Sequence, residues 1–438
     1  MGADAVTAKL GDSETLRHLQ EKSFDYFLCE ANSANGLVLD KTAENWPASI
    51  AAVGMALTAY PVGVKRHFLS RESAIERTLT TLRFFATSEQ SEAADATGYR
   101  GFYYHFLDMG SGKRAWECEL SSIDTALFIA GALTAAAYFD QQSAAEVEIR
   151  ALATLLYERI EWDWMLAGSK KLCHGWKPER AGGFLEFHWE GYDEALVLYV
   201  LALGSPTHPI GAESYRAWCE SYEWKSVYGI EYLYAGPLFI HQLSHIWIDF
   251  RGIRDAFMRE KGSDYFENSR RATQVQQQYS IRNPLGLASV GEFLWGVSAS
   301  DGPGPATKKI AGVGRVFYDY IARGAPFGPD DGTVAPWAVV ASLPFAPEIV
   351  LPTVMNFRRL NVQVANPYGF KASINPTFSV RGGSEVGWVS PFHFGINEGP
   401  TVLMIENYRS EMIWTLMQSC IPIKRGLEAA GFEGGWLA

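Results

Sequence analysis

The sequence predicts an all-α protein in which antiparallel helix pairs close into a ring, with long loops and a short strand-like region late in the chain. Apolar residues recur at intervals of three and four in roughly a dozen segments, which is the spacing of one helix face. Loops rich in glycine, proline and aromatic residues separate these segments, and a ring of paired helices would gather such loops beside a central cavity. An open superhelical stack would show a repeat of about 30 to 50 residues, and the sequence shows none.

Helices are expected along most of the chain. Ser13 is expected to cap the first helix, and Leu16 and Leu19 follow at helical spacing. Further helices are expected at 49–60, 70–87, 119–140, 143–160, 190–203, 211–221, 240–260, 263–282, 307–323, 344–360 and 400–419. Some strand-like alternation lies within 361–398. No linker-like segment separates these parts, so we expect residues 1–438 to form a single domain.

The composition is that of an ordered globular protein. Hydrophobic residues make up 47% of the chain and charged residues 20%, which is enough apolar surface for a large core. The net charge is −11 and basic residues form no cluster, so nucleic acid is not expected as a partner. The cysteines are far apart and form no Cys-x-x-Cys pair, which argues against a disulfide framework and a zinc site: Cys29, Cys118, Cys173, Cys219 and Cys420.

The hydropathy of the chain predicts a soluble protein with no membrane partner. No run of about 18 apolar residues occurs, and the N-terminus lacks the basic and apolar regions of a signal peptide. We expect a cytoplasmic protein, or a periplasmic one if a signal peptide has been removed. The oligomeric state is left open.

Glu194 is the leading candidate for a general acid. It shares a face of the helix expected at 190–203 with Leu198 and Leu201. Burial of a carboxyl group without a cation raises its pKa, so the group can hold a proton near neutral pH, as a general acid must. The alternative is a salt-bridged glutamate at a helix start, where the helix dipole favours acids.

Asp124 repeats this arrangement. In the helix expected at 119–140 it shares a face with Leu120, Phe128 and Gly131. The alternative is a buried aspartate satisfied by a neighbouring hydroxyl or backbone amide.

Glu398 is a candidate for a second catalytic carboxylate. It stands just before Gly399 and Pro400, and proline marks a first helical position. The positive end of the helix would lower the pKa of Glu398, so the carboxylate could activate a water molecule while Glu194 donates a proton. The alternative is a simple capping acid.

Aromatic residues crowd the loops around Glu194 and Asp124, together with polar neighbours. Flat rings stack on the apolar faces of sugars and polar side chains bond hydroxyl groups, so we expect an oligo- or polysaccharide substrate; a protein interface is the alternative. The aromatic residues are Tyr99, Phe102, Tyr103, Tyr104, Trp116, Trp176, Phe184, Phe187, His188, Trp189 and Tyr192, and the polar ones are His105, Arg114, Lys177 and Arg180.

A polar stripe is predicted on the helix expected at 240–260. His241, His245 and Asp249 would lie one helical turn apart, a spacing that could bind a metal ion. No glutamate follows His241 as in zinc peptidases, and Arg251 lies nearby. We therefore interpret the stripe as a hydrogen-bonded pocket wall and expect no metal and no cofactor.

Several longer strings occur in a characteristic order along the chain: FDYF (24–27), SIAAVGMALTAYPVGV (49–64), ELSSIDTAL, LALGSPTHP, SHIWIDFRGI, DYFENSRRAT (264–273), EFLWGVSASDGPG (292–304), DDGTVAPWAVVASLPFAPE (330–348) and MIENYRS. With these strings the chain resembles the glucoamylase-like family, which includes the β-1,2-glucanases of glycoside hydrolase family 144. The resemblance covers nearly the whole chain.

This resemblance implies an (α/α)6 barrel and a metal-independent, inverting hydrolysis of β-1,2-linked glucan. It assigns the general acid to Glu194 and a supporting carboxylate to Asp124. The sequence departs from the family patterns at two positions, with Asn397 where an aspartate is expected and Ala372 in place of another. Glu398, one position along, could act as the base, or the base could lie elsewhere.

The sequence therefore predicts a β-glucan hydrolase with Glu194, Asp124 and Glu398 as catalytic residues. A transglycosylase and a non-catalytic carbohydrate-binding barrel remain as alternatives. The predicted substrate-binding residues are Glu119, Trp116, Trp176, His188, Trp189, Tyr192, His245, Asp249, Arg251 and Trp295.

Overall fold

The computed structural model describes residues 3–360, 362, 367–380 and 386–438, and helices predominate among them, as predicted. The chain groups into two compact units, each built from three stretches. Unit 1 comprises the residues up to Tyr26, Trp224–Leu243 and Glu267–Arg409, and unit 2 comprises Phe27–Glu223, Ser244–Phe266 and Ser410–Ala438. The expected single domain remains a prediction.

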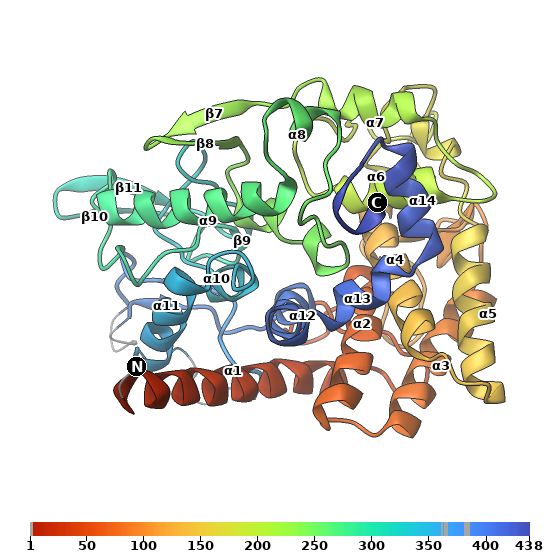
Figure 1. Ribbon diagram of the computed structural model, residues 1–438, viewed down its shortest axis with the longest axis horizontal. Coiled ribbons are helices and arrows are strands. Elements are labelled where there is room, and N and C mark those ends of the chain that lie inside the picture. The colour runs from red at the N-terminus through yellow and green to blue at the C-terminus, as the bar shows by residue number, and fades with distance from the viewer. Residues whose placement is uncertain (1–2, 361, 363–366, 381–385) are drawn as a thin grey trace. The chain divides into compact units, whose positions relative to one another are not determined.

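Unit 2 is built mainly from helices that pack in pairs (Figure 1). The orange to yellow helices of Figure 1 belong to this unit, and among them α2 packs against α4 and α3 against α5. Its helices are α2 (Ile50–Arg66), α3 (Arg71–Thr87), α4 (Ser122–Tyr138), α5 (Ala144–Glu158), α6 (Leu196–Gly204), α7 (Ala212–Cys219), α8 (Ala256–Glu260), α13 (Met412–Gln418) and α14 (Ile421–Ala429), with the short 3-10 turns Trp164–Leu166, Ser244–Ile246 and Gly435–Leu437.

A serine starts each of the four long helices of unit 2. Ser49, Ser70, Ser121 and Ser143 have extended backbones, and each side chain accepts a hydrogen bond from the amide three residues on. Such caps satisfy one of the amides that a helix start leaves unbonded, and each contributes about 1 kcal/mol. These caps fix the starts of α2, α3, α4 and α5 close to the predicted positions.

Two helix pairs in unit 2 touch backbone to backbone at glycines. A Cβ on Gly131 of α4 would overlap the Gly54 carbonyl oxygen, and one on Gly54 of α2 would overlap the Leu127 carbonyl oxygen. The pair α6 and α14 repeats this contact, because a Cβ on Gly426 would overlap the Val200 carbonyl oxygen. Only glycine allows helices to approach so closely.

Unit 2 also contains a four-stranded antiparallel sheet and a separate short strand pair. The strands of the sheet run in the order β2 (Gly98–Tyr99), β3 (Phe102–Tyr104), β5 (Leu120–Ser121) and β6 (Gly175–Trp176), and the pair consists of β1 (Ala48–Ser49) and β4 (Phe106–Leu107). Tyr103 lies opposite Ser121, and Leu120 lies opposite Trp176. Because β5 runs directly into α4, Glu119 and Asp124 fall at the two ends of one strand-to-helix junction.

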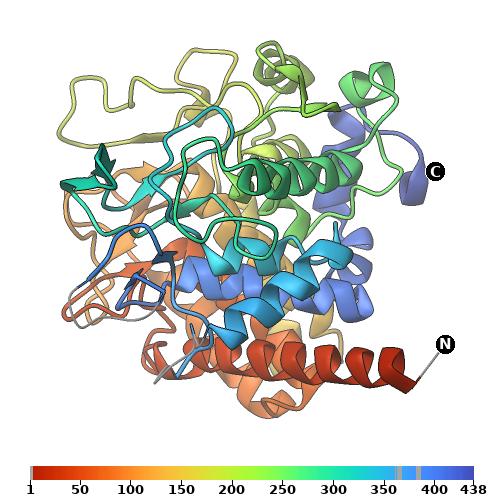
Figure 2. The ribbon, with the colours of Figure 1, turned by 90° about the vertical axis from the view of Figure 1, so that its left-hand side faces the viewer.

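Within its described residues, unit 1 combines helices with four antiparallel strand pairs (Figures 1 and 2). The side chain of Gln20 on α1, the red helix in Figure 2, bonds Glu406 on α12 at 3.0 Å, so these two helices lie side by side. Its helices are α1 (Ala3–Cys29), α9 (Tyr265–Arg282), α10 (Pro336–Ala341), α11 (Pro347–Arg359) and α12 (Gly395–Ser410), wholly or in the main, with a 3-10 turn at Leu238–His241. Its strand pairs are β7 (Trp224–Val227) with β8 (Ile230–Leu233), β9 (Ala299–Ser300) with β12 (Ile321–Ala322), β10 (Ala306–Ile310) with β11 (Val313–Phe317), and β13 (Ile374–Asn375) with β14 (Trp388–Val389).

Two predicted helices are wrong. The stretch 240–260 contains two 3-10 turns and only the short helix α8, and residues 241–250 are all buried, so their apolar pattern carries no helical period. The stretch 307–323 is mainly the hairpin β10–β11. Ala311 and Gly312 form its tip with φ of 50° and 85°, the backbone of a two-residue hairpin turn.

Several boundaries also differ from the prediction. The first helix begins at Ala3, so Ser13 lies inside it and not at its cap. The helix expected at 190–203 begins at Leu196, and the one expected at 400–419 divides at Glu411, whose backbone is left-handed. The helices α10 and α14 were not predicted. Part of the strand-like stretch 361–398 lies outside the described residues, and the described part holds β13 and β14.

No helix within the described ranges combines the length and the apolar character that crossing a bilayer requires.

The glycine contact between α2 and α4 gives a stability prediction. Gly131→Ala should lower the free energy of unfolding by about 1–3 kcal/mol, because the added methyl group forces two tightly packed backbones apart. Thermal unfolding followed by circular dichroism would measure this loss. Gly314→Ala is the matched control, since a Cβ on Gly314 meets open space; equal melting temperatures for the two variants would contradict the packing argument.

Candidate active site

Glu194 lies in the turn that immediately precedes α6, one residue before the helix N-cap Ala195. Because Ala195 offers no side-chain cap, Ser244 supplies one from another stretch of unit 2. The Ser244 hydroxyl accepts from the Val197 amide at 3.0 Å and donates to the Glu194 carbonyl oxygen at 3.4 Å. The backbone that carries Glu194 is therefore held from both sides of the turn.

The carboxyl group of Glu194 holds its proton at neutral pH. The side chain is partly exposed yet largely enclosed by protein, and burial raises its pKa to about 8, with the nearby negative charges of Asp124 and Asp193 acting in the same direction. The charge of His105 opposes this shift but does not cancel it. The sequence-based expectation of a raised pKa agrees with this environment.

Asp193, the neighbour of Glu194, is a second titratable group that sequence reasoning missed. Burial raises its pKa to about 7, although its carboxylate accepts hydrogen bonds from the Trp218 indole at 3.1 Å and the Ala195 amide at 2.9 Å. The pair of consecutive acids before an apolar helix was a possible signal, but the expected helix start at 190 placed Asp193 on a different face from Glu194.

Asp124 lies in the first turn of α4, where Ser121 contacts it twice. The Ser121 hydroxyl accepts from the Asp124 amide at 3.1 Å and donates to the Asp124 Oδ2 at 2.5 Å. The carboxylate is buried, and burial raises its pKa while His105 and Ser121 oppose the shift. The alternative of a hydroxyl-satisfied aspartate thus describes one side of Asp124, and a charged group occupies the other.

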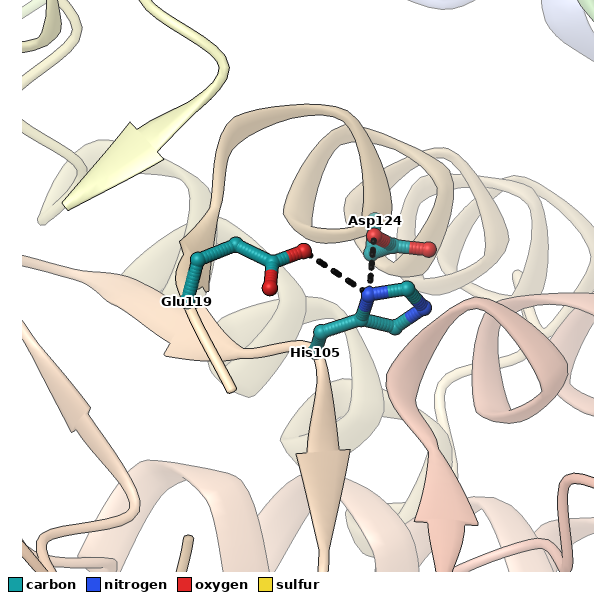
Figure 3. Close-up of side chains that lie close together, drawn as sticks. All are labelled: His105, Glu119 and Asp124. Atoms are coloured by element: carbon teal, nitrogen blue, oxygen red, sulfur yellow. Dashed lines mark hydrogen bonds and ion pairs between the residues drawn. The ribbon is translucent and has the colours of Figure 1, made fainter. Parts of the chain in front are cut away.

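His105 is that charged group, and it lies between two carboxylates (Figure 3). Its Nδ1 is 2.9 Å from Glu119 Oε1 and 3.7 Å from Asp124 Oδ2. Burial alone would lower the pKa of His105, but Asp124, Glu119 and Asp40 raise it to about 9. Burial likewise acts to raise the pKa of Glu119, and the hydrogen bond from His105 outweighs it. At neutral pH an imidazolium therefore lies between the two acids.

The same three residues are the group in the described part of the chain that could hold a metal ion. The ligand atoms of His105, Glu119 and Asp124 all lie within 4.8 Å of one another. A divalent cation could bind there only by displacing the proton that the two carboxylates stabilise on the imidazole.

Asp40 adds a further carboxyl group, and sequence reasoning missed it. Burial raises its pKa to about 6, while the Trp46 indole donates to Asp40 Oδ2 at 3.0 Å and the charge of His105 acts to lower the pKa. Asp40 stands in a loop after three apolar residues, without a helical or motif context, so its sequence carried no signal.

The predicted aromatic residues divide between exposed and packed positions. Trp116 is 55% exposed. Trp189 is buried, stacks on the His174 ring at 3.9 Å and donates its indole N–H to the Ser122 hydroxyl. Trp176 and Tyr192 are buried within aromatic clusters, and so are the strand residues Phe102 and Tyr103. Tyr104 is buried as well, and the Arg114 guanidinium lies 4.6 Å from its ring centroid. The partly exposed His188 has a ring nitrogen, Nε2, with no hydrogen-bond partner among the described residues.

His245, Asp249 and Arg251 do not form a helical stripe. His245 lies in a 3-10 turn, and its ring packs against Phe250. Asp249 accepts two hydrogen bonds from the Arg251 guanidinium, both at 2.8 Å, and Arg251 also pairs with Glu411 at 2.7 Å. His241 belongs to unit 1, where it ends the 3-10 turn Leu238–His241. Asp249 and Arg251 thus neutralise each other in a side-chain network of unit 2.

Glu398 lies in unit 1, in the first turn of α12. The helix begins at Gly395, so Pro400 lies inside it and not at its first position. Burial raises the pKa of Glu398, and the hydrogen bond with His393 Nδ1 at 2.8 Å only reduces that effect. The expected lowering by the helix dipole is therefore wrong, because desolvation of the enclosed carboxyl group outweighs the dipole.

Two other residues of unit 1 concern the predicted site. Asn397 is buried, and its side-chain nitrogen has no hydrogen-bond partner among the described residues. Trp295 is fully buried and donates its indole N–H to Thr353 Oγ1 at 2.9 Å, which places it in a core and not on a surface that a substrate could reach.

Comparison with known proteins identifies the family. Residues 186–421 match the family model described as "Putative glucoamylase", which is more than half of the chain, so the protein belongs to this family. The resemblance seen in the sequence is confirmed.

Named relatives are similar over nearly the whole chain. An exo β-1,2-glucooligosaccharide sophorohydrolase (non-reducing end) of Parabacteroides distasonis is 27% identical over 97% of this chain, and the chain spans 58% of that relative's length. A crystal structure described as a putative glucoamylase from Bacteroides uniformis has a TM-score of 0.85 and 28% identity, covering 98% of this chain and 99% of the other. An endo-β-1,2-glucanase from Chitinophaga pinensis, solved with sophorotriose and glucose, has a TM-score of 0.84 and 25% identity, covering 97% of this chain and 99% of the other.

The enclosed position of Glu194 gives a stability prediction. Its pKa rises from about 4.5 to about 8 on folding, so its contribution to stability is fully present below about pH 4.5 and is lost as the pH rises through 8. Glu194→Gln carries no charge to bury and should raise the melting temperature more at pH 8.5 than at pH 4. Glu231→Gln, a change at an exposed side chain, is the control. A Glu194→Gln effect that does not depend on pH would contradict the assignment.

Proposed function

We propose that the protein is a glycoside hydrolase that cleaves β-1,2-linked glucan or its oligosaccharides, with the chain folded as an (α/α)6 barrel. The names of the similar proteins support β-1,2-linked glucan as the substrate, since one relative is a β-1,2-glucooligosaccharide hydrolase and another is an endo-β-1,2-glucanase. Those two names also differ, one being exo-acting and the other endo-acting, so they support the linkage and not the position of cleavage.

Glu194 serves as the general acid in this proposal, and the observation that carries it is the enclosure of its side chain near Asp124 and Asp193. A general acid must deliver a proton to the leaving glycosidic oxygen, which requires a pKa at or above the working pH. The enclosed position of Glu194 beside two other acids raises its pKa to about 8. Once the proton has left, the resulting carboxylate is destabilised by Asp124 and Asp193, which favours reprotonation for the next turnover.

Asp124 and its partners support the acid. Ser121 and His105 fix the Asp124 carboxylate, so its negative charge stays at a constant position relative to Glu194. Glu119 shares the His105 proton and has a partly exposed side chain, so it could accept a hydrogen bond from a sugar hydroxyl. We assign Asp124 a positioning and electrostatic role and Glu119 a substrate-binding role.

Glu398 remains the candidate for the base that activates water in an inverting reaction. An asparagine side chain cannot accept a proton from water, which leaves the adjacent Glu398 as the titratable group at this place in the sequence. Its hydrogen bond with His393 favours the carboxylate form that a base requires. Asn397, standing where the family pattern has an aspartate, also keeps transfer to a second sugar open as a second candidate activity.

The predicted substrate-binding residues have different roles in the proposal, because some are exposed and others are buried. Trp116 offers an exposed ring to a sugar, and His188 has a partly exposed side chain. Trp189, Tyr192 and Trp176 are buried, so in this proposal they support the loops that carry them and do not contact the sugar directly. We propose the network of His245, Asp249 and Arg251 as a pocket wall, as expected from the sequence. No cofactor is part of the proposed reaction.

A substrate panel tests the proposed function. The protein should shorten β-1,2-glucan and leave β-1,3-, β-1,4- and α-linked glucans intact, with products sized by chromatography and mass spectrometry. Glu194→Gln should lower the rate by roughly a hundredfold or more, since the amide cannot donate the proton. Longer or cyclic products would favour transfer. Binding of β-1,2-glucan without any product would overturn the hydrolase assignment. Full activity of Glu194→Gln would overturn the assignment of Glu194 as the general acid.

The pKa of Glu194 sets an expected pH dependence. The protonated form is active, so kcat/KM should fall as the pH rises through about 8. Initial rates on a β-1,2-glucooligosaccharide between pH 4 and 10 would show this alkaline limb. An activity that still increases above pH 9 would show that no carboxyl group acts as the proton donor.

A further inference from the structure

Trp116 is a large apolar side chain that unit 2 presents to solvent. It is 55% exposed, and its backbone has a φ of 54°, followed by Glu117 with a φ of 50°. A bulky residue in the left-handed region costs on the order of 1–2 kcal/mol, so two such residues in succession persist only where their surroundings hold them. The exposed ring is therefore held in a strained loop.

Two aromatic rings support Trp116. Trp46 meets it edge-on, with ring centroids 4.7 Å apart and planes at 76°, and Phe106 lies at 5.2 Å. Trp46 is itself anchored at two points, because its indole N–H donates to Asp40 Oδ2 at 3.0 Å and the Lys41 ammonium lies 4.9 Å from its ring. Exposed hydrophobic residues that stand singly need no explanation, but Trp116 is part of a fixed aromatic group.

This aromatic group contacts the cluster of His105, Glu119 and Asp124 through Phe106. Phe106 stacks on the His105 ring, with centroids 3.9 Å apart and planes at 13°, and His105 holds Glu119 and Asp124. Asp40 joins the two parts, since it accepts from Trp46 and also acts electrostatically on His105. An exposed ring, a hydrogen-bonding carboxylate and the cluster that includes Asp124 are thus joined by one chain of side-chain contacts in unit 2.

We propose that Trp116, supported by Trp46, is a platform for one glucosyl residue of the substrate, and that Asp40 accepts a hydrogen bond from a hydroxyl group of that sugar. The faces of a β-glucosyl ring carry axial C–H bonds, which the negative face of an indole attracts. The equatorial hydroxyl groups at the ring edge meet a carboxylate. The inference rests on the proposed function for the identity of the sugar, and it adds a binding subsite with two residues, Asp40 and Trp46, that the sequence did not indicate.

Calorimetry with β-1,2-glucooligosaccharides of two to five glucose units tests the platform. Binding is measured in the Glu194→Gln background, so that no substrate is consumed. Trp116→Ala should weaken binding of the longer oligosaccharides roughly tenfold, and Trp116→Phe should restore part of the loss. Trp46→Phe keeps a ring but removes the hydrogen bond to Asp40, so its affinity should lie between the two.

Steady-state kinetics in the protein with Glu194 intact provide the second readout. Loss of a platform away from the cleaved bond should raise KM for Trp116→Ala about tenfold and change kcat little. Tyr228→Ala is the control, because Tyr228 is an exposed aromatic residue of unit 1 at 37% exposure and should leave KM unchanged. Melting temperatures would confirm that the Trp116 variants are folded, and Trp116→Phe keeps the test valid if the alanine variant is not.

The outcomes separate this inference from the proposed function. If Trp116→Ala and Trp46→Phe bind as tightly as the parent while Glu194→Gln is inactive, the platform is wrong and the hydrolase assignment stands. If the protein cleaves no glucan but binds β-1,2-glucooligosaccharides through Trp116, the platform stands and the hydrolase assignment fails.

Discussion

The imidazolium of His105 between Glu119 and Asp124 is the interaction on which the proposed chemistry depends. It offsets the effect of burial on two carboxyl groups, because it lowers the pKa of Glu119 and limits the rise in the pKa of Asp124. Among the described residues Glu194 has no cationic partner at such a distance, and the negative charge of Asp124 makes its ionisation harder. One cation thus gives neighbouring acids different pKa values, and this difference separates a proton donor from the groups that position it.

The backbone of unit 2 fixes the positions of these acidic side chains. The serine cap of α4 places Asp124 in the first turn, and the preceding strand β5 places Glu119 on the other side of the same junction. Ser244 caps the turn before α6 and fixes Glu194. The close glycine contact between α2 and α4 fixes the position of the helix that carries Asp124. A small change in the packing of these helices would therefore shift the Asp124 carboxylate.

The sequence predicted the helical class and most helix positions in unit 2, because serine caps and apolar faces are local signals. It also predicted the raised pKa of Glu194, whereas the catalytic roles of Glu194 and Asp124 stay predictions. It did not predict Asp40, Asp193 or the charge on His105, since these depend on contacts between residues far apart in the chain. The helix expected at 240–260 failed for a related reason. A stretch that is buried on all sides shows many apolar residues whatever its backbone does. The lowered pKa expected for Glu398 failed because desolvation, which the sequence does not show, outweighed the helix dipole.

The ionisation of Glu194 is the central claim, and a direct titration measures it. Carbon-13 labelling of the glutamate side-chain carboxyl groups, followed by NMR from pH 3 to 10, would resolve one resonance that is absent in Glu194→Gln. That resonance should titrate near pH 8, and its midpoint should fall in Asp124→Asn, which removes the negative charge that opposes ionisation. A midpoint near 4.5, unchanged in Asp124→Asn, would contradict the account.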